Sequence, residues 1–198
     1  EINKLFVIAG IIVKNDYHDT KLTDSLNSIK DIIWDNPKDI TKRRTYILHE
    51  KEVTSARFGH FGKLKHKYHR IFAKSSKYNL LYEKMSELIQ NSELTTLGAC
   101  IRQKELHGLY HYNTLNDKKS ILMQIIIENY YHFLVEYDAI GTICYEAMPE
   151  NQNAIINKRY QYIKNTGTMF YPAKKINSKI KNKSFNFTVN FLGWIKHS

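Results

Sequence analysis

Near its start the chain has an unbroken apolar run from Leu5 to Val13 (LFVIAGIIV). Because the run is rich in β-branched residues and apolar at consecutive positions, it predicts a central strand covered on both faces. Shorter apolar segments predict three further strands, over residues 45–49, 94–101 and 139–146.

Apolar residues at helical spacing predict helices between these strands. The stripe over residues 22–33 repeats every three or four positions, and Asp19 or Thr20 can cap this helix. Similar stripes predict two helices within residues 61–90, a long helix that starts near Asp117 with Leu122, Ile126, Tyr130, Phe133 and Tyr137 on one face, and a helix over 151–165. Strands that alternate with helices are typical of an α/β domain with a largely parallel or mixed sheet. The alternating segment 184–195 (SFNFTVNFLGWI) predicts a half-buried edge strand.

The composition is that of an ordinary globular protein. The 198 residues are 42% hydrophobic and 25% charged, which excludes a disordered chain, a collagen and a disulfide scaffold. The first apolar run is much shorter than the roughly 20 residues of a membrane span. Cys100 and Cys144 lie in predicted strands without metal-type spacing, so we expect buried thiols in a reducing compartment. With no secretory signal at the N-terminus, this predicts a cytoplasmic protein that does not bind membranes.

The net charge of +11 is concentrated towards the C-terminus. Residues 151–198 carry nine Lys and Arg and no acid, whereas the first 150 residues are nearly balanced. A basic end predicts an anionic partner, with nucleic acid favoured over a membrane surface. The alternative is that an AT-rich coding sequence enriches Lys, Asn, Ile and Tyr throughout, and both interpretations stay open.

The spacing of the histidines by itself gives little evidence of a functional site. His107 and His111 are four residues apart, but Gly108 stands where a metalloprotease helix requires glutamate, so we do not expect a metal site there. His66 and His69 fall on a predicted helix whose remaining polar residues indicate a solvated basic face, namely Lys63, Lys65, Lys67 and Arg70.

Two glutamates are better candidates for chemistry. Glu146 ends the predicted strand 139–146, and Glu52 follows the predicted strand 45–49. Mg²⁺ prefers oxygen ligands, and carboxylates that converge from strand ends can supply them. Two such ions can clamp a phosphodiester. The alternative is that both are ordinary solvated acids at the starts of loops.

The order of these motifs resembles the DUF3800 family over residues Leu5 to Ile176. The shared features are FVIAGIIV, then HEKEV followed by Arg57, Phe61 and Leu64, then the long helix with HFL, and then TICYEA. The resemblance implies a ribonuclease H-like mixed sheet with flanking helices over 1–176, followed by a basic, atypical segment at 177–198. It also implies a bacterial, Mg²⁺- or Mn²⁺-dependent nuclease with a role in phage defence.

The resemblance assigns roles residue by residue. His49 and Glu52 match the family's His-x-x-Glu signature, Glu146 its strand-end glutamate and Lys104 a lysine after the third strand. It therefore implies that Glu52 and Glu146 hold metal and take part in catalysis, and that His49 orients a ligand or moves a proton. Lys104 is then expected to contact phosphates, together with Arg57, Lys174, Lys175 and Lys179.

Two family motifs are not found in this sequence. The family opens with a strand that ends in Asp-Glu-Ser-Gly and closes with a helix that carries Gln-Leu-Ala-Asp, and both aspartates are expected ligands. Here no aspartate follows Asp138. We therefore expect a fold that is incomplete at both ends and impaired catalysis in this form. The alternative is a non-catalytic module that binds nucleic acid or a protein partner, or forms a homo-oligomer, so the sequence leaves open whether the chain is an enzyme.

Overall fold

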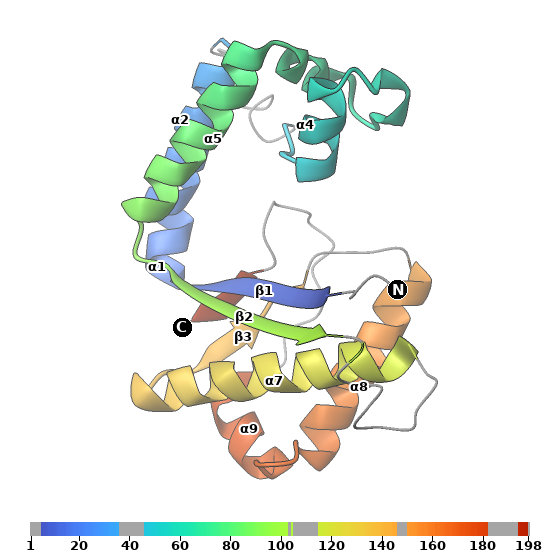
Figure 1. The fold of residues 1–198 in the computed structure, drawn as a ribbon. Coiled ribbons are helices and arrows are strands. Elements are labelled where there is room, and N and C mark those ends of the chain that lie inside the picture. Colours follow the sequence, from blue (N-terminus) through green and yellow to red (C-terminus); the bar gives the residue numbers. More distant parts are fainter. Residues whose placement is uncertain are drawn as a thin grey trace. The chain divides into compact units, whose positions relative to one another are not determined.

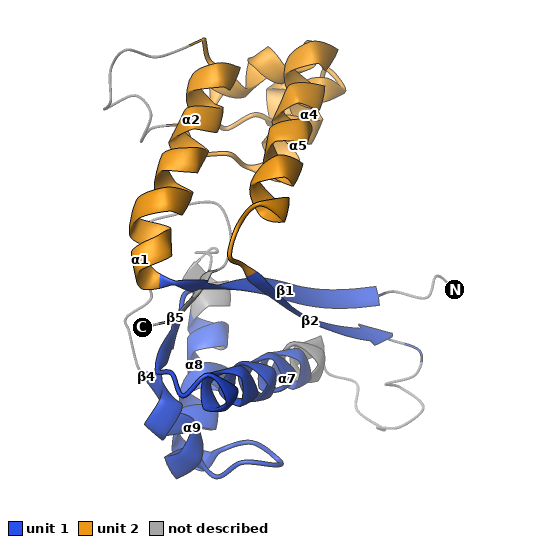
Figure 2. Ribbon diagram, turned by 90° about the vertical axis from the view of Figure 1, so that its left-hand side faces the viewer, with its two compact units in different colours: residues 1–14, 95–188, 192–198 blue, residues 15–94, 189–191 orange. Residues whose placement is uncertain are grey.

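A computed structural model describes residues 5–35, 46–102, 104, 115–145, 150–181 and 194–197. The chain divides into two compact units, which Figure 2 shows in different colours. Unit 1 comprises Glu1–Lys14, Thr95–Thr188 and Leu192–Ser198, and unit 2 comprises Asn15–Leu94 and Val189–Phe191. We describe each unit by itself. The division at residue 176 expected from the sequence stays a prediction.

Unit 1 contains a five-stranded mixed sheet in the order β2-β1-β5-β3-β4. Strand β1 pairs antiparallel with β2 and parallel with β5, while β3 pairs antiparallel with β5 and parallel with β4. The prediction of an α/β protein with a mixed sheet is therefore confirmed. The strands are β1 (Leu5–Lys14), β2 (Thr95–Arg102), β3 (Gly141–Ile143), β4 (Ile180–Lys181) and β5 (Trp194–His197).

Three helices lie on one side of this sheet, as Figure 1 shows: α7 (Leu115–Glu136), α8 (Glu150–Thr166) and α9 (Ala173–Lys179). The long helix α7 packs against β1 and β2. Its predicted apolar face is confirmed at its centre, where Leu122, Ile126 and Tyr130 are buried in the core of the unit. The prediction is wrong at Tyr137, which is 61% exposed because α7 ends one residue before it.

The close packing of α7 on β3 depends on Gly141. A Cβ atom at this position would lie 1.8 Å from the hydroxyl of Tyr130 and 2.9 Å from a methyl of Leu134. The strand can therefore approach the helix only because residue 141 has no side chain. This contact falls in the predicted strand 139–146, which is much shorter than expected because only Gly141–Ile143 pair with neighbours.

Unit 2 is helical. Helix α1 (Asn15–Tyr17) continues through the π-helical turn η1 (His18–Leu22) into α2 (Thr23–Ile33). The predicted cap at Asp19 or Thr20 is wrong, because the helix runs through both residues and has no free N-terminus there. Helix α5 lies beside α2 in both views (Figures 1 and 2). The remaining elements are α4 (Glu50–Arg57), the 3₁₀ turns η2 (Phe61–Lys63) and η3 (Lys67–Ala73), and α5 (Ser75–Gln90).

The core of unit 2 explains why residues 46–49 are not in a strand, as had been predicted for 45–49. Leu48 is buried with Ile33 and Val53 among helices. The apolar residues of this segment therefore pack, but its backbone has no neighbouring strand with which to pair. Residue 45 lies outside the described residues, as do the alternating residues 185–191 of the predicted edge strand.

The predicted burial of the two thiols is wrong. Cys100 is exposed and Cys144 is half-buried, and neither forms a disulfide. Cys100 lies on β2, an edge strand on which Ala99 points into the core and the next residue points away from it. None of the helices in the described ranges combines the length and the apolar character that crossing a membrane requires.

Candidate metal centre

Glu52 lies on the inner face of α4. This short helix follows His49, whose extended backbone ends the preceding segment and whose carbonyl accepts the N–H groups of Glu52 and Val53, both at 2.9 Å. Val53 and Ala56 are buried on the same helix, and Glu52 is only 7% exposed. The interpretation of Glu52 as a solvated acid at the start of a loop is therefore wrong. Such burial requires compensating polar partners.

Two histidines supply those partners, His66 directly before η3 and His69 within it. The backbone N–H of His66 donates to Glu52 Oε2 at 2.9 Å, and His66 Nδ1 lies 3.2 Å from Glu52 Oε1. His69 Nδ1 lies 3.0 Å from Glu52 Oε2. One possible ligand atom from each of the three residues lies within 4.8 Å of the other two, so the cluster could hold a metal ion. We call Glu52, His66 and His69 the Glu–His–His cluster.

The local backbone explains why both imidazoles face the carboxylate. Residues 61–73 form two 3₁₀ segments instead of the predicted α-helix. His66 is the extended residue that precedes η3 and His69 lies in its first turn, and both side chains reach the Glu52 carboxylate from there. The predicted solvated basic face is therefore wrong at these two positions, since His69 is fully buried and His66 is half-buried.

The protonation states suit a metal ligand set. Burial by itself raises the pKa of Glu52, but the hydrogen bonds from His66 and the charges of both imidazoles outweigh it and lower the pKa. Burial lowers the pKa of His69 and outweighs the opposing effect of the nearby carboxylate. At neutral pH the cluster therefore presents an ionised carboxylate beside a neutral imidazole. These are the forms in which the two groups coordinate metals.

His69 also has a free ligand atom. Its Nε2 is buried, and no polar atom in the described part of the chain forms a hydrogen bond with it. An unsatisfied buried polar atom costs about 1–3 kcal/mol. Two arrangements are chemically consistent: Nδ1 and Glu52 share one ion, with the proton on Nε2, or Nδ1 donates its proton to Glu52 and Nε2 is the ligand, in which case Glu52 orients the imidazole and does not bind that ion itself.

Aromatic side chains hold the two histidines in place. The ring of Tyr68 stacks on His66 with centroids 5.1 Å apart and lies 4.6 Å from the ring of His69. The Tyr68 hydroxyl accepts the N–H of Ile47 at 3.0 Å, and the Trp34 indole donates to the Tyr68 carbonyl at 3.3 Å. The cluster is thus attached to the segment that precedes α4 and to the end of α2.

Three of the residues predicted from the sequence occur together on or next to α4. His49 precedes the helix, Glu52 is in its first turn and Arg57 is in its last turn, where its guanidinium lies 5.8 Å from the centre of the Tyr78 ring. His49 is not a member of the Glu–His–His cluster. Glu146 lies outside the described residues. The roles assigned to these four residues stay predictions.

The predicted phosphate-binding lysines belong to unit 1. Lys104 follows β2 and is exposed, and Lys174 and Lys175 are exposed on α9. Lys179 differs from them because its Nζ forms an ion pair with Asp138 at 2.7 Å. Lys174 and Lys175 are therefore better placed than Lys179 to contact an anion.

Sequence reasoning missed His66 and His69 as partners of Glu52. The available signal was a His-x-x-His pair that follows a candidate acid by 14 to 17 residues. The bases around the pair favoured a solvated face instead, and only the backbone geometry at the start of η3 turns both imidazoles inward.

Comparison with family models, with curated proteins and with solved structures finds no match to this chain. The likeness to the DUF3800 family therefore rests on the sequence motifs alone and stays a prediction.

Proposed function

We propose that this protein is a divalent-metal-dependent nuclease and that Glu52, His66 and His69 hold the metal. The observation that carries the proposal is a buried, ionised carboxylate that faces two imidazole nitrogens, with one ligand atom of each residue within 4.8 Å of the other two. The reaction class comes from the resemblance to ribonuclease H-like proteins. A mixed sheet with an antiparallel β1–β2 pair, covered by a long helix, is compatible with that fold.

The donor set favours Mn²⁺ among the ions expected from the sequence. Imidazole nitrogen is a poor ligand for Mg²⁺, which prefers oxygen, whereas Mn²⁺ accepts carboxylate oxygen and histidine nitrogen. A bound divalent ion supplies Lewis acidity and lowers the pKa of a coordinated water. Glu52 contributes the negative charge of the site, and the two imidazoles complete it without adding charge when neutral.

The test combines metal binding with cleavage. Isothermal titration calorimetry with Mn²⁺ should show one site in the wild-type protein that is lost in Glu52→Gln and His69→Gln. The matched controls, Glu50→Gln and His60→Gln, change exposed residues close in sequence and should bind Mn²⁺ normally. Single- and double-stranded DNA and RNA should then be incubated with Mn²⁺, Mg²⁺ or no metal.

We expect Mn²⁺-dependent cleavage that Glu52→Gln abolishes and Glu50→Gln retains. Glu146→Gln should also reduce cleavage if the strand-end glutamate takes part, as the resemblance implies. Normal Mn²⁺ binding by Glu52→Gln would contradict the assignment of the metal ligands. Unchanged cleavage by Glu52→Gln would contradict the catalytic role of this centre.

A second candidate is a non-catalytic module that binds nucleic acid in the cytoplasm, alone or with a protein partner. The observation that favours it is the pair of exposed lysines, Lys174 and Lys175, on α9. If both contact phosphates of duplex DNA, the double variant Lys174→Gln/Lys175→Gln should lower the slope of log K against log salt by roughly 2, since each contact contributes ~0.9. Lys51→Gln/Lys67→Gln, at two exposed lysines of unit 2, is the matched control, and equal slopes in both variants would exclude the role of α9.

A further inference from the structure

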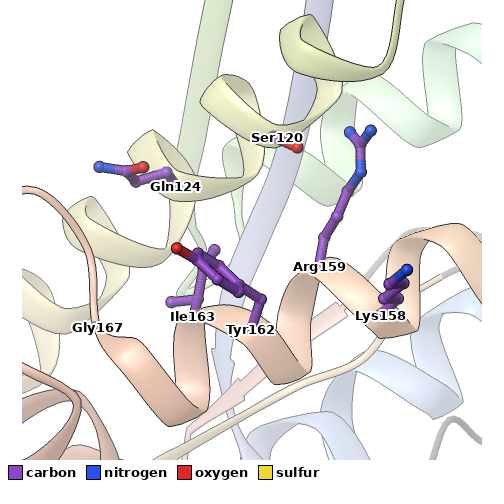
Figure 3. A pocket seen from close by; sticks show the side chains of 7 residues that line it. All are labelled: Ser120, Gln124, Lys158, Arg159, Tyr162, Ile163 and Gly167. Carbon is purple, nitrogen blue, oxygen red and sulfur yellow. The ribbon is translucent and has the colours of Figure 1, made fainter.

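Unit 1 contains a pocket of about 430 Å³ between α7 and α8, which Figure 3 shows from close by. Ser120 and Gln124 line it from α7, and Lys158, Arg159 and Tyr162 line it from α8. Its volume lies in the lower part of the ~300–1,000 Å³ range of small-molecule sites. The pocket is therefore large enough for one small ligand and too small for a base-paired duplex.

The polar lining of this pocket favours an anion. Lys158 and Arg159 are adjacent cations on α8, and no carboxylate occurs among the described lining residues. Arg159 is half-buried where it lines the pocket. A partly buried guanidinium binds a phosphate or a carboxylate strongly because charge-assisted hydrogen bonds gain strength away from water. Ser120 adds a hydroxyl that can donate to the same group.

The opposite part of the pocket is suited to a flat ring. Tyr162 is 66% exposed and lines the pocket together with Gln124, towards which its hydroxyl is directed in Figure 3. Ile163, which is buried, forms an apolar wall beside it. The Gln124 amide nitrogen already donates to Glu128 at 3.3 Å, which leaves the amide oxygen able to accept a hydrogen bond from a ligand. An aromatic ring with an amide acceptor beside it can hold a nucleobase by stacking and by one hydrogen bond.

From this arrangement we infer that the pocket binds a single nucleotide unit, with its phosphate at Lys158 and Arg159 and its base against Tyr162. The nucleotide can be free or can be the phosphorylated end of a strand, since both present the same chemistry. All the residues concerned belong to unit 1, so this binding does not depend on the metal centre proposed for unit 2.

The test measures binding of adenosine 5′-monophosphate, adenosine, inorganic phosphate and a short oligothymidylate with and without a 5′-phosphate, by isothermal titration calorimetry without added metal. The wild-type protein should bind the monophosphate more tightly than adenosine or phosphate. Tyr162→Ala should weaken this binding by about 5- to 150-fold, the effect of losing one stacked base, and Tyr162→Phe should retain it. Tyr137→Ala, at an exposed tyrosine of the same unit, is the matched control.

The part of the pocket lined by Lys158 and Arg159 is tested with separate variants. Lys158→Gln/Arg159→Gln should weaken binding of the monophosphate and leave binding of adenosine unchanged, while Lys174→Gln/Lys175→Gln should alter neither. Tighter binding of the phosphorylated oligothymidylate than of its unphosphorylated form supports a strand end, and binding of the monophosphate alone supports a free nucleotide. No binding of either probe, or equal binding by wild type and Tyr162→Ala, overturns the inference. Glu52→Gln should bind the monophosphate normally, which separates this result from the outcome at the metal centre.

Discussion

Replacing Glu52 by alanine should destabilise the protein more than any change at an exposed residue of the same helix. The carboxylate accepts the backbone N–H of His66 and lies within hydrogen-bond distance of two imidazole nitrogens. Alanine removes all three interactions and leaves the His66 N–H and the His69 Nδ1 without an acceptor. Because His69 is fully buried, water cannot replace the lost partner.

The size of the effect follows from these contacts. A hydrogen bond to a charged group contributes about 1.5–3 kcal/mol, and leaving a buried donor without an acceptor costs about 1–3 kcal/mol. We expect Glu52→Ala to lower the free energy of unfolding by an amount in the second range. Glu52→Gln keeps the shape and one acceptor oxygen, so its cost should be smaller.

Urea unfolding followed by circular dichroism measures this difference. The matched control is Glu50→Ala, because Glu50 is exposed on the same helix and accepts the Thr54 hydroxyl at 2.6 Å, an interaction in contact with solvent. The measurements should be made in a chelator, so that loss of a bound metal does not add to the effect. If Glu52→Ala costs no more than Glu50→Ala, the described hydrogen bonds do not stabilise unit 2 and the argument for the cluster fails.

Three further predictions concern other features of the structure. The pKa values of His69 and Glu52 are lowered in the folded chain, so the unfolded chain binds more protons, and urea unfolding should show stability falling as the pH drops below ~6.5 and again below ~4.5. In Glu52→Gln the second fall should be lost, whereas the first should persist, because the carboxylate raises the pKa of His69 and its removal lowers that pKa further. Gly141→Ala should cost about 1–3 kcal/mol or more by overpacking, whereas Gly98→Ala, whose Cβ would lie 4.0 Å from its nearest neighbour, should show a much smaller change in thermal unfolding. The exposed Cys100 thiol should react with an aromatic disulfide reagent in the native state as fast as it does in urea, and a much slower native reaction would contradict its exposure.

Local sequence patterns predicted the helices and strands that have a regular spacing of apolar residues. The apolar stripe over residues 22–33 became α2, and the run Leu5–Val13 became most of β1. The predicted cover on both faces of this strand is wrong for its first half, where Leu5 and Val7 are exposed, and is found only over residues 11–13. The spacing of apolar residues indicates which face of a helix or strand can be buried, so the prediction of these elements needs little information about distant parts of the chain. The same holds for the centre of the long helix α7.

Predictions of strands, which need a neighbouring strand for their backbone hydrogen bonds, were less successful. The segment 46–49 has the composition of a strand, but a strand needs a neighbour for its backbone, and unit 2 offers helices. The long predicted strand 139–146 is shortened for a related reason, because only the residues near Gly141 find pairing partners. Hydrogen-bond partners in a sheet are distant in sequence, and no local pattern identifies them.

By itself the sequence determined an α/β protein with an apolar first strand, amphipathic helices and a basic C-terminal part, and it singled out Glu52 as an acid of interest. The tertiary structure alone decided that Glu52 is buried and that His66 and His69 are its partners. The physical reason is that a charged side chain can be buried only where other parts of the chain supply its hydrogen bonds. Those partners lie at the start of η3, 14 to 17 residues away, and the geometry there depends on the packing of the whole unit.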